Sequence, residues 1–228
     1  MSIQILGIDI GIRNYSYTLA EFTYDENKES KVSERSKKHN IDVVIDDNLK
    51  ILKWDVVDLT KDVEDVNYQK IPADLKPSVY PILIRNLHYI LEGLDITPDI
   101  VVVESQAKFQ EEGKLLENYT FGYYCVRRFD NGFDDDCGMK ILTQSAGTKL
   151  KFCSDEYKEP FAHLKSSHSR NKKTGTLWAE TMILNSEWID TFKKHKKRDD
   201  LADSLLHIHG YILNNYDDIR SEYFEMVL

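Results

Sequence analysis

Cysteine is scarce in this sequence, and long hydrophobic runs are absent. The three cysteines, Cys125, Cys137 and Cys153, are odd in number and form no CxxC pair. This argues against a disulfide scaffold and against a zinc site built on cysteine, and it fits a reducing compartment. No stretch of about 18 consecutive apolar residues occurs, which argues against a membrane-spanning helix.

Targeting signals are not recognisable either. Neither a signal peptide nor an Arg/Ser-rich transit peptide precedes the first apolar segment. We therefore expect an intracellular protein, with the cytoplasm, a viral factory and a mitochondrion all open as its compartment. The 228 residues, 41% of them hydrophobic, suit one domain over residues 1–228, with charged insertions near 24–50 and 160–175.

Positive charge is in deficit overall but gathers in one part of the chain. The formal net charge is −9, which argues against a general nucleic-acid binder. Between Lys165 and Arg198, however, nine Lys/Arg face only three acids, a local balance of +6. A local basic face binds phosphates even on an acidic molecule. A plain solvated surface run remains the alternative.

Hydrophobic periodicity predicts an α/β fold. Ser78 is the expected N-cap of the first helix, with Pro81 in its first turn. The polar, basic segment 160–175 lacks periodicity and is expected to be a mobile loop. The element order indicates a sheet layered with helices. The predicted strands are 3–10, 15–22, 51–57, 99–104 and 138–144, and the predicted helices are 79–94, 106–128, 176–187 and 199–214.

One acidic residue interrupts the apolar opening "ILGIDIGIRN". Asp9 follows Ile8 in a strand that otherwise reads as buried. A carboxylate removed from water is costly unless an opposite charge meets it. A turn aspartate at the strand end, a metal ligand and a phosphate-binding loop are the three interpretations.

Two further acidic spots lie far along the chain. Glu104 ends the apolar run "DIVVVE", at the strand end where ligands gather in open α/β sheets. Asp200 and Asp203 in "RDDLADS" are three apart at a helix start, so they share a face that His207 continues one turn on. Helix capping explains the aspartates equally well when they are taken alone, as a surface acid explains Glu104.

The combination favours metal-dependent chemistry. Several carboxylates brought together repel one another and raise each other's pKa values, which divalent cations relieve. Two Mg²⁺ ions about 3.5–4 Å apart clamp the attacking and leaving oxygens of a phosphodiester. Oxygen ligands select Mg²⁺ or Mn²⁺ over zinc.

At these residues the sequence resembles a known family. The opening "GIDIGIRN", the strand end "VVVESQ" and the late "KKRDDLADSLLH" are similar to the RuvC-type Holliday-junction resolvases of the RNase H-like superfamily. The closer resemblance is to the group of poxvirus and other large-DNA-virus resolvases and fungal mitochondrial cruciform-cutting endonucleases. It implies a single RNase H-like domain, with a mixed sheet that is antiparallel in its first three strands, then parallel, and flanked by helices.

The resemblance also implies an activity. The protein would be a homodimer that cuts two opposing strands of a four-way DNA junction, with two Mg²⁺ per active site, Mn²⁺ as a substitute, and water as nucleophile. Asp199 is the neighbour that would replace Asp200 if the helix register shifted by one. The four acids that match the family's catalytic, metal-binding set are Asp9, Glu104, Asp200 and Asp203.

The sequence departs from the family after Glu104. Where viral and fungal members carry Arg-Gln and further arginines, it has Ser105, Gln106, Ala107 and Lys108, and this puts junction binding in doubt more than cleavage. Phe109 follows on a predicted helix, where core packing is preferred over stacking on a base. The candidate DNA-binding residues are Gln106, Lys108, Lys193, Lys194, Lys196, Lys197 and Arg198.

Three other functions stay open. A "GIDIG" hairpin also opens actin-like and sugar-kinase folds, but with only 10 glycines the sequence lacks a Gly-rich adenosine loop. A branched-DNA-binding protein of the same fold with weak or no cleavage is the second alternative. An RNA/DNA-hybrid or flap nuclease is the third, since it would use the same metal chemistry.

Overall fold

The computed structural model describes residues 2–24, 48–61, 68–72, 74–130, 139–219 and 221. Most of the predicted insertion near 24–50 lies outside these residues. The five described strands form one sheet in the order β3-β2-β1-β4-β5. β1 and β2 pair antiparallel, as do β2 and β3, whereas β4 pairs parallel to both β1 and β5. This confirms the predicted mixed sheet.

All five predicted strands are present. The alternating and β-branched segments give β1 (Ser2–Asp9), β2 (Tyr15–Thr23), β3 (Leu49–Val57), β4 (Ile100–Ser105) and β5 (Lys140–Ser145). Parallel pairing aligns the carboxyl ends of β1, β4 and β5 at one edge of the sheet. Residues at or just after these ends are therefore neighbours, although they are far apart in sequence.

The predicted helices are present with shifted bounds. Ser78 does not cap the first helix, because the short helix η2 (Lys76–Val79) precedes it and Val79 takes the cap position. The helices are α3 (Tyr80–Leu94), α4 (Glu111–Asp130), α5 (Asp155–Lys158), α6 (Ser167–Met182), α7 (Ile189–Lys194) and α8 (Arg198–Asn214), and the short 3-10 helices are η1 (Tyr68–Lys70), η3 (Ala146–Leu150) and η4 (Glu159–Phe161).

The mobile loop predicted over 160–175 is wrong. Most of the segment belongs to η4 and α6, whose N-cap Ser166 accepts a hydrogen bond from the Ser169 backbone N–H. Thr174, Gly175 and Trp178 are buried, so α6 has an inner face despite its polar composition. The segment is ordered by packing on α8, a tertiary contact that local periodicity does not encode.

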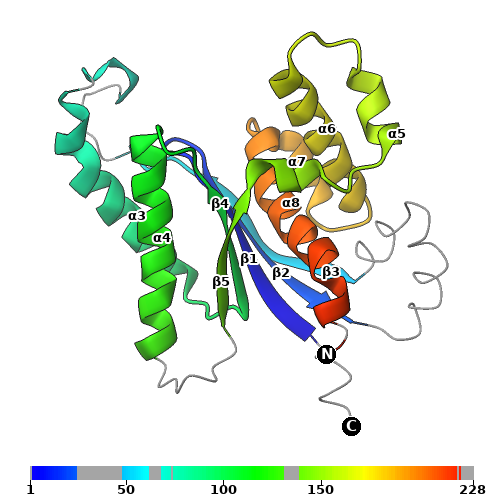
Figure 1. The fold of residues 1–228 in the computed structure, drawn as a ribbon, viewed down its shortest axis with the longest axis horizontal. Coiled ribbons are helices and arrows are strands. Elements are labelled where there is room, and N and C mark those ends of the chain that lie inside the picture. Colours follow the sequence, from blue (N-terminus) through cyan, green and yellow to red (C-terminus); the bar gives the residue numbers. More distant parts are fainter. Residues whose placement is uncertain are drawn as a thin grey trace.

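Helices cover both faces of the sheet. Figure 1 shows α3 and α4 side by side on one face, and α8 on the other with α6 and α7 outside it. The α3/α4 side buries leucines such as Leu83 and Leu87 against Leu6 and Val101. The α8 side buries Ile208 and neighbouring residues against the opposite face of the sheet. The sheet is therefore the middle of three layers.

Helix α8 lies unusually close to the sheet at Gly7. A Cβ at position 7 would come within 2.4 Å of the Ser204 backbone oxygen, so only glycine fits there. The hydroxyl of Ser16 donates to the Asp200 carbonyl at 2.6 Å, and the indole of Trp54 donates to the Leu201 carbonyl at 3.0 Å. These contacts fix the first turns of α8 on β1, β2 and β3.

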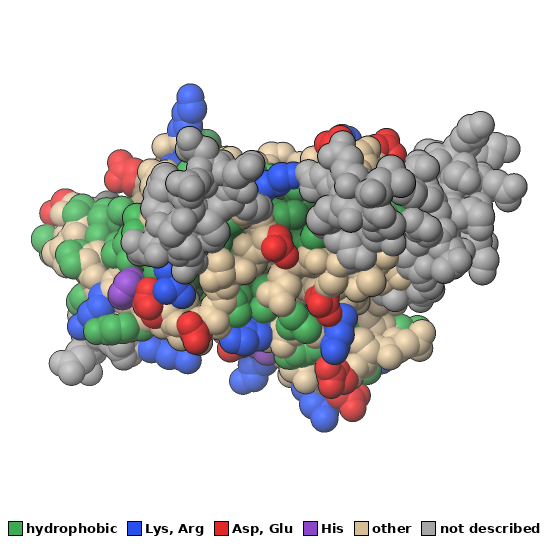
Figure 2. All heavy atoms as spheres, turned by 90° about the horizontal axis from the view of Figure 1, so that it is seen from below, with side chains coloured by type: hydrophobic (Ala, Val, Ile, Leu, Met, Phe, Trp, Pro, Cys, Tyr) green, Lys and Arg blue, Asp and Glu red, His purple; other side chains and the backbone are tan. Residues whose placement is uncertain are grey.

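Charges of both signs occur together on one face of the molecule. Figure 2 shows the molecule from below, and basic and acidic side chains are scattered over the described part of this face. Among the described helices, none combines the length and apolar character needed to cross a bilayer.

Replacing Gly7 tests the close approach of α8. Gly7→Ala is expected to lower the free energy of unfolding by about 1–3 kcal/mol, because overpacking forces the helix off the sheet. Gly93→Ala in α3 is the matched control, since its Cβ would meet nothing within 4 Å. It should be neutral or stabilising by up to about 1 kcal/mol. Equal stability of the two variants in urea denaturation would contradict the interpretation.

Buried His209 predicts a pH-dependent stability. Its ring packs edge-on against Trp178 at 4.8 Å, and burial lowers its pKa to about 3. Below pH of about 6.5 the unfolded chain binds a proton that the folded imidazole does not, so stability falls with pH by up to about 1.4 kcal/mol per unit. His209→Phe keeps the ring contact and should flatten melting temperatures between pH 7 and 5. An unchanged pH profile would refute this source of acid sensitivity.

Candidate active site

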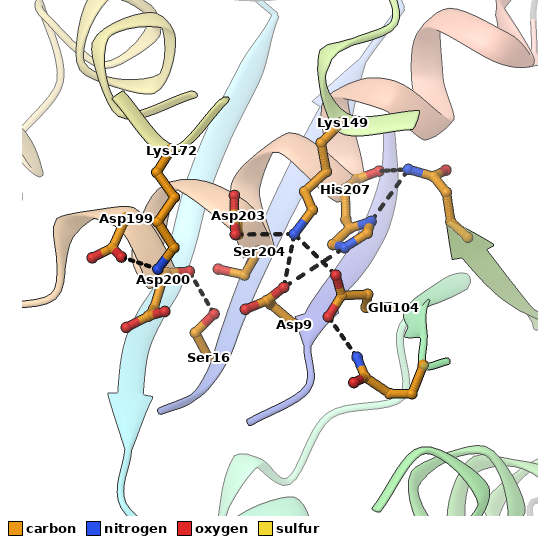
Figure 3. Close-up of polar contacts among 12 residues, drawn as sticks. Asp9, Ser16, Glu104, Lys149, Lys172, Asp199, Asp200, Asp203, Ser204 and His207 are labelled. Carbon is orange, nitrogen blue, oxygen red and sulfur yellow. Dashed lines mark hydrogen bonds and ion pairs between the residues drawn. The ribbon is translucent and has the colours of Figure 1, made fainter. Parts of the chain in front are cut away.

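Acidic side chains meet at the carboxyl edge of the sheet. Asp9 is the last residue of β1, and Glu104 is the penultimate residue of β4. Asp203 approaches them from the second turn of α8, as Figure 3 shows. Three of the four predicted acidic residues, which come from separate sequence motifs, thus lie together in the structure.

A buried lysine lies at the centre of this group. Lys149 comes from η3, directly after β5, and only 7% of its side chain is exposed. Its Nζ lies 2.9 Å from Asp9 Oδ1, 3.2 Å from Glu104 Oε1 and 3.0 Å from Asp203 Oδ2. The ammonium therefore neutralises part of the charge of three carboxylates, which we call the acid triad (Asp9, Glu104 and Asp203).

The pKa values reflect burial and this crowding. Burial raises the pKa of Asp9 well above its usual value, opposed by Lys149 and reinforced by Glu104 and Asp203. Burial likewise raises the pKa of Asp203. Burial alone would lower the pKa of Lys149, but the triad outweighs it and raises that pKa, so the lysine remains charged. The site therefore favours a bound cation.

Asp200 lies beside the triad rather than in it. Its carboxylate faces Lys197 at 3.9 Å, and burial and Asp199 raise its pKa. Asp199 instead pairs with Lys172 of α6, which lowers the pKa of Asp199 despite its partial burial. Figure 3 shows this second group next to Asp203. The metal-binding role of Asp200 stays a prediction.

His207 supplies a neutral donor to the same site. Its ring is fully buried, and burial followed by Lys149 lowers its pKa well below the usual value. Its Nε2 has no hydrogen-bond partner within the part of the chain that the structure describes, and it lies 4.0 Å from Asp9 Oδ1. Gln144 is within 3.3 Å of the other ring nitrogen and orients the ring.

The donor set fits a divalent cation. Asp9, Glu104 and His207 each offer a ligand atom, and these atoms lie within 4.8 Å of one another. The unsatisfied Nε2 of His207 is the specific observation, because buried polar atoms are rarely left without a partner. Carboxylate oxygens and an imidazole nitrogen are both ligands that divalent metal ions use in proteins.

Of the residues after Glu104, Gln106 has a structural partner and two others are exposed. Gln106, a candidate DNA contact, donates from its side chain to Glu104 Oε2 at 2.6 Å and thereby orients the carboxylate. Lys108 is exposed. The expectation that Phe109 packs in the core from a helix is wrong, because it precedes α4 and is 85% exposed.

The basic run 193–198 lies around the start of α8. Lys193 and Arg198 reach Glu180 of α6 at 3.7 and 3.8 Å, and Lys197 faces Asp200. Lys194 and Lys196 are exposed. The run therefore contacts acidic residues of α6 and α8 outside the acid triad, and its contact with DNA stays a prediction.

Sequence reasoning missed Lys149 and Lys172. The signal for Lys149 was present, because β5 was predicted parallel to β4, so the turn after it falls at the edge that holds Glu104. Lys172 belongs to the basic cluster between Lys165 and Arg198, but nothing in the sequence paired it with Asp199, which it reaches through the packing of α6 on α8.

Comparison with known proteins supports the resemblance. The fold and the acidic edge define an RNase H-like architecture, and residues 5–108 match the family model "Mitochondrial resolvase Ydc2 / RNA splicing MRS1". No curated protein matches the chain in sequence.

Two solved structures share the fold over most of the chain. The fowlpox virus Holliday junction resolvase aligns with a TM-score of 0.51 and 18% identity, covering 94% of this chain and 99% of that one. The yeast mitochondrial resolvase Ydc2 aligns with a TM-score of 0.55 and 17% identity, covering 96% and 85%. The resemblance inferred from the sequence motifs is confirmed at the level of the fold.

Removing Lys149 tests the acid triad. Lys149→Met is expected to cost about 3–5 kcal/mol of stability in EDTA, because it leaves buried carboxylates without a counter-charge. Added Mn²⁺ should restore much of the loss by replacing the missing cation.

Lys114→Met is the matched control for this experiment. Lys114 pairs with the buried carboxylate of Glu117 at 2.7 Å, but outside the triad. Its loss should not be restored by Mn²⁺. If melting temperatures of the two variants respond alike to Mn²⁺, the triad is not a cation site.

Proposed function

We propose that this protein is a structure-selective DNA endonuclease that resolves four-way (Holliday) junctions by metal-dependent phosphodiester hydrolysis. The observation that carries the proposal is the convergence of Asp9, Glu104 and Asp203 on one cation at the carboxyl edge of the sheet. The fold relatives named for Holliday junctions support the substrate, and one of them, the fowlpox resolvase, was solved together with its substrate junction.

The triad, together with Asp200 and His207, would hold the metal. Mg²⁺ is the expected ion, two per site, with Mn²⁺ as a substitute. When bound, such ions polarise the phosphodiester and stabilise the attacking and leaving oxygens. Gln106 positions Glu104, and Gln144 positions His207.

Lys149 contributes a fixed positive charge to the same place. Its ammonium is held among the three carboxylates and remains protonated, because they raise its pKa. A fixed charge at this position suits the extra negative charge that a phosphodiester develops during hydrolysis. Lys149 therefore serves the reaction as an electrostatic group rather than as a base.

Branched DNA and a second copy of the chain are the proposed partners. A four-way junction needs two cuts in opposing strands, which two copies of one active site supply symmetrically. The basic run 193–198 would contact backbone phosphates beside each site. Whether the compartment is a mitochondrion, a viral factory or the cytoplasm stays open under this proposal.

The two alternatives with the same fold make different demands on the site. A branched-DNA binder without cleavage does not need the buried triad, whose assembly around a cation therefore favours catalysis. A hybrid or flap nuclease would use the same triad, and differs only in the nucleic acid that is cut.

Asp9→Asn tests the function directly. It should reduce cleavage of a synthetic four-way junction by more than about 100-fold, because even groups that only support metal ligands contribute 10–100-fold. Junction binding should stay within about threefold, because Asp9 contacts no phosphate in this proposal. Gel assays with Mg²⁺, Mn²⁺ and EDTA measure both quantities.

The controls separate the alternatives. Asp155→Asn removes an exposed carboxylate on α5 and should cut as the wild type does. Duplex, flap, RNA/DNA hybrid and structured RNA are assayed in parallel with the junction. Normal cutting by Asp9→Asn would refute the metal site, and preferred cutting of another substrate would replace the junction assignment.

A further inference from the structure

A pocket of about 600 Å³ opens between α6 and the start of α8. Its apolar floor comes from Phe161 and Leu177, and two hydroxyls, Ser169 and Thr176, lie in its wall. The charged residues that line it are Lys172, Lys173, Lys196, Arg198, Glu180 and Asp199. It joins two basic segments that are separate in the sequence.

The cations in this pocket fall into two groups. Lys172 is held by Asp199, and Arg198 lies 3.8 Å from Glu180. Lys173 and Lys196 have no acidic partner among the described residues, and Lys173 lies over the Phe161 ring at 5.9 Å. The pocket therefore presents two ammonium groups that no described carboxylate neutralises. Their positive charge is available to attract a bound phosphate.

The pocket adjoins the acid triad. Asp199 lines it, and the next carboxylate along α8, Asp200, lies beside Asp203 (Figure 3). The neighbouring Lys197 lines a different pocket, with Arg13 and Lys76, on the side of the β1–β2 turn. The consecutive residues Lys196 and Lys197 thus line two different pockets. The face shown in Figure 2 instead carries basic and acidic side chains together.

We propose that this pocket, which we call the α6–α8 pocket, is a phosphate subsite for a nucleic-acid strand that runs past the active site. One backbone phosphate would bind between Lys173 and Lys196, with the Ser169 hydroxyl as a further donor, because the Thr176 hydroxyl already donates to the Lys172 carbonyl at 2.8 Å. Lys172 stays on Asp199 and keeps that carboxylate from repelling the strand. The inference rests on the proposed nuclease function and names where its substrate is held outside the triad.

The double variant Lys173→Gln/Lys196→Gln tests the subsite. It should weaken junction binding by about 10- to 100-fold at low salt, the range for hydrogen bonds to charged groups. The slope of log K against log salt should fall by about 1, because one phosphate contact is lost. Lys50→Gln/Lys158→Gln removes the same charge at exposed positions elsewhere and should leave the slope unchanged.

A chemical footprint gives a second readout that needs no cleavage. Wild-type protein in EDTA is acetylated at lysines with and without junction, duplex or RNA, and mass spectrometry measures each site. Lys173 and Lys196 should be protected by nucleic acid, whereas Lys50 and Lys158 should not. Protection together with the reduced slope supports the subsite.

The outcomes distinguish the subsite from the function. If the protein cuts junctions but neither lysine is protected and the slope is unchanged, the subsite is wrong and the nuclease stands. If duplex or RNA protects both lysines while no junction is cut, the subsite stands and the junction function falls. If no nucleic acid protects them and no junction is cut, both proposals fall.

Discussion

The contact of one buried ammonium with three carboxylates organises this molecule. Charges removed from water are stable only when they are paired and hydrogen-bonded. Lys149 pairs with Asp9, Glu104 and Asp203 at once. Lys149, Asp9 and Glu104 are buried, and Asp203 is partly buried. One positive charge does not balance three negative ones, so the cluster retains an attraction for further cations. This excess of negative charge raises the free-energy cost of burying the cluster, and it also suits the site to a metal ion.

The precision of the site comes from the docking of α8. The helix brings Asp203 and His207 to the sheet and must lie close enough for both to reach Asp9. Gly7 provides the space for this close approach, and hydrogen bonds from the sheet to the helix carbonyls fix the position of α8 over the sheet. Because these contacts are polar and directional, they define one position, whereas apolar packing alone would allow sliding.

Much of the fold could be predicted from local sequence patterns. The candidate site could be predicted in part from acidic residues at the ends of neighbouring strands. The β-branched runs and the leucine stripes specify their strands and helices without tertiary information. Asp9 and Glu104 could be placed together because they end neighbouring strands. Phe109 was placed wrongly, because the predicted helix included it and its apolar side chain was expected to pack in the core. Phe109 instead precedes α4, and it is 85% exposed. The polar α6 could not be recognised either, because its order depends on α8 rather than on its own periodicity.

The order of the site residues along the chain has a consequence for synthesis. Asp9 is made first, Glu104 and Lys149 in the middle, and Asp203 and His207 last, within α8. While a ribosome is still adding residues before α8, the emerging polypeptide holds an incomplete set of ligands. Under the proposed function, such a nascent chain cannot yet hydrolyse nucleic acid, and the set of site residues is complete only when α8 packs onto β1.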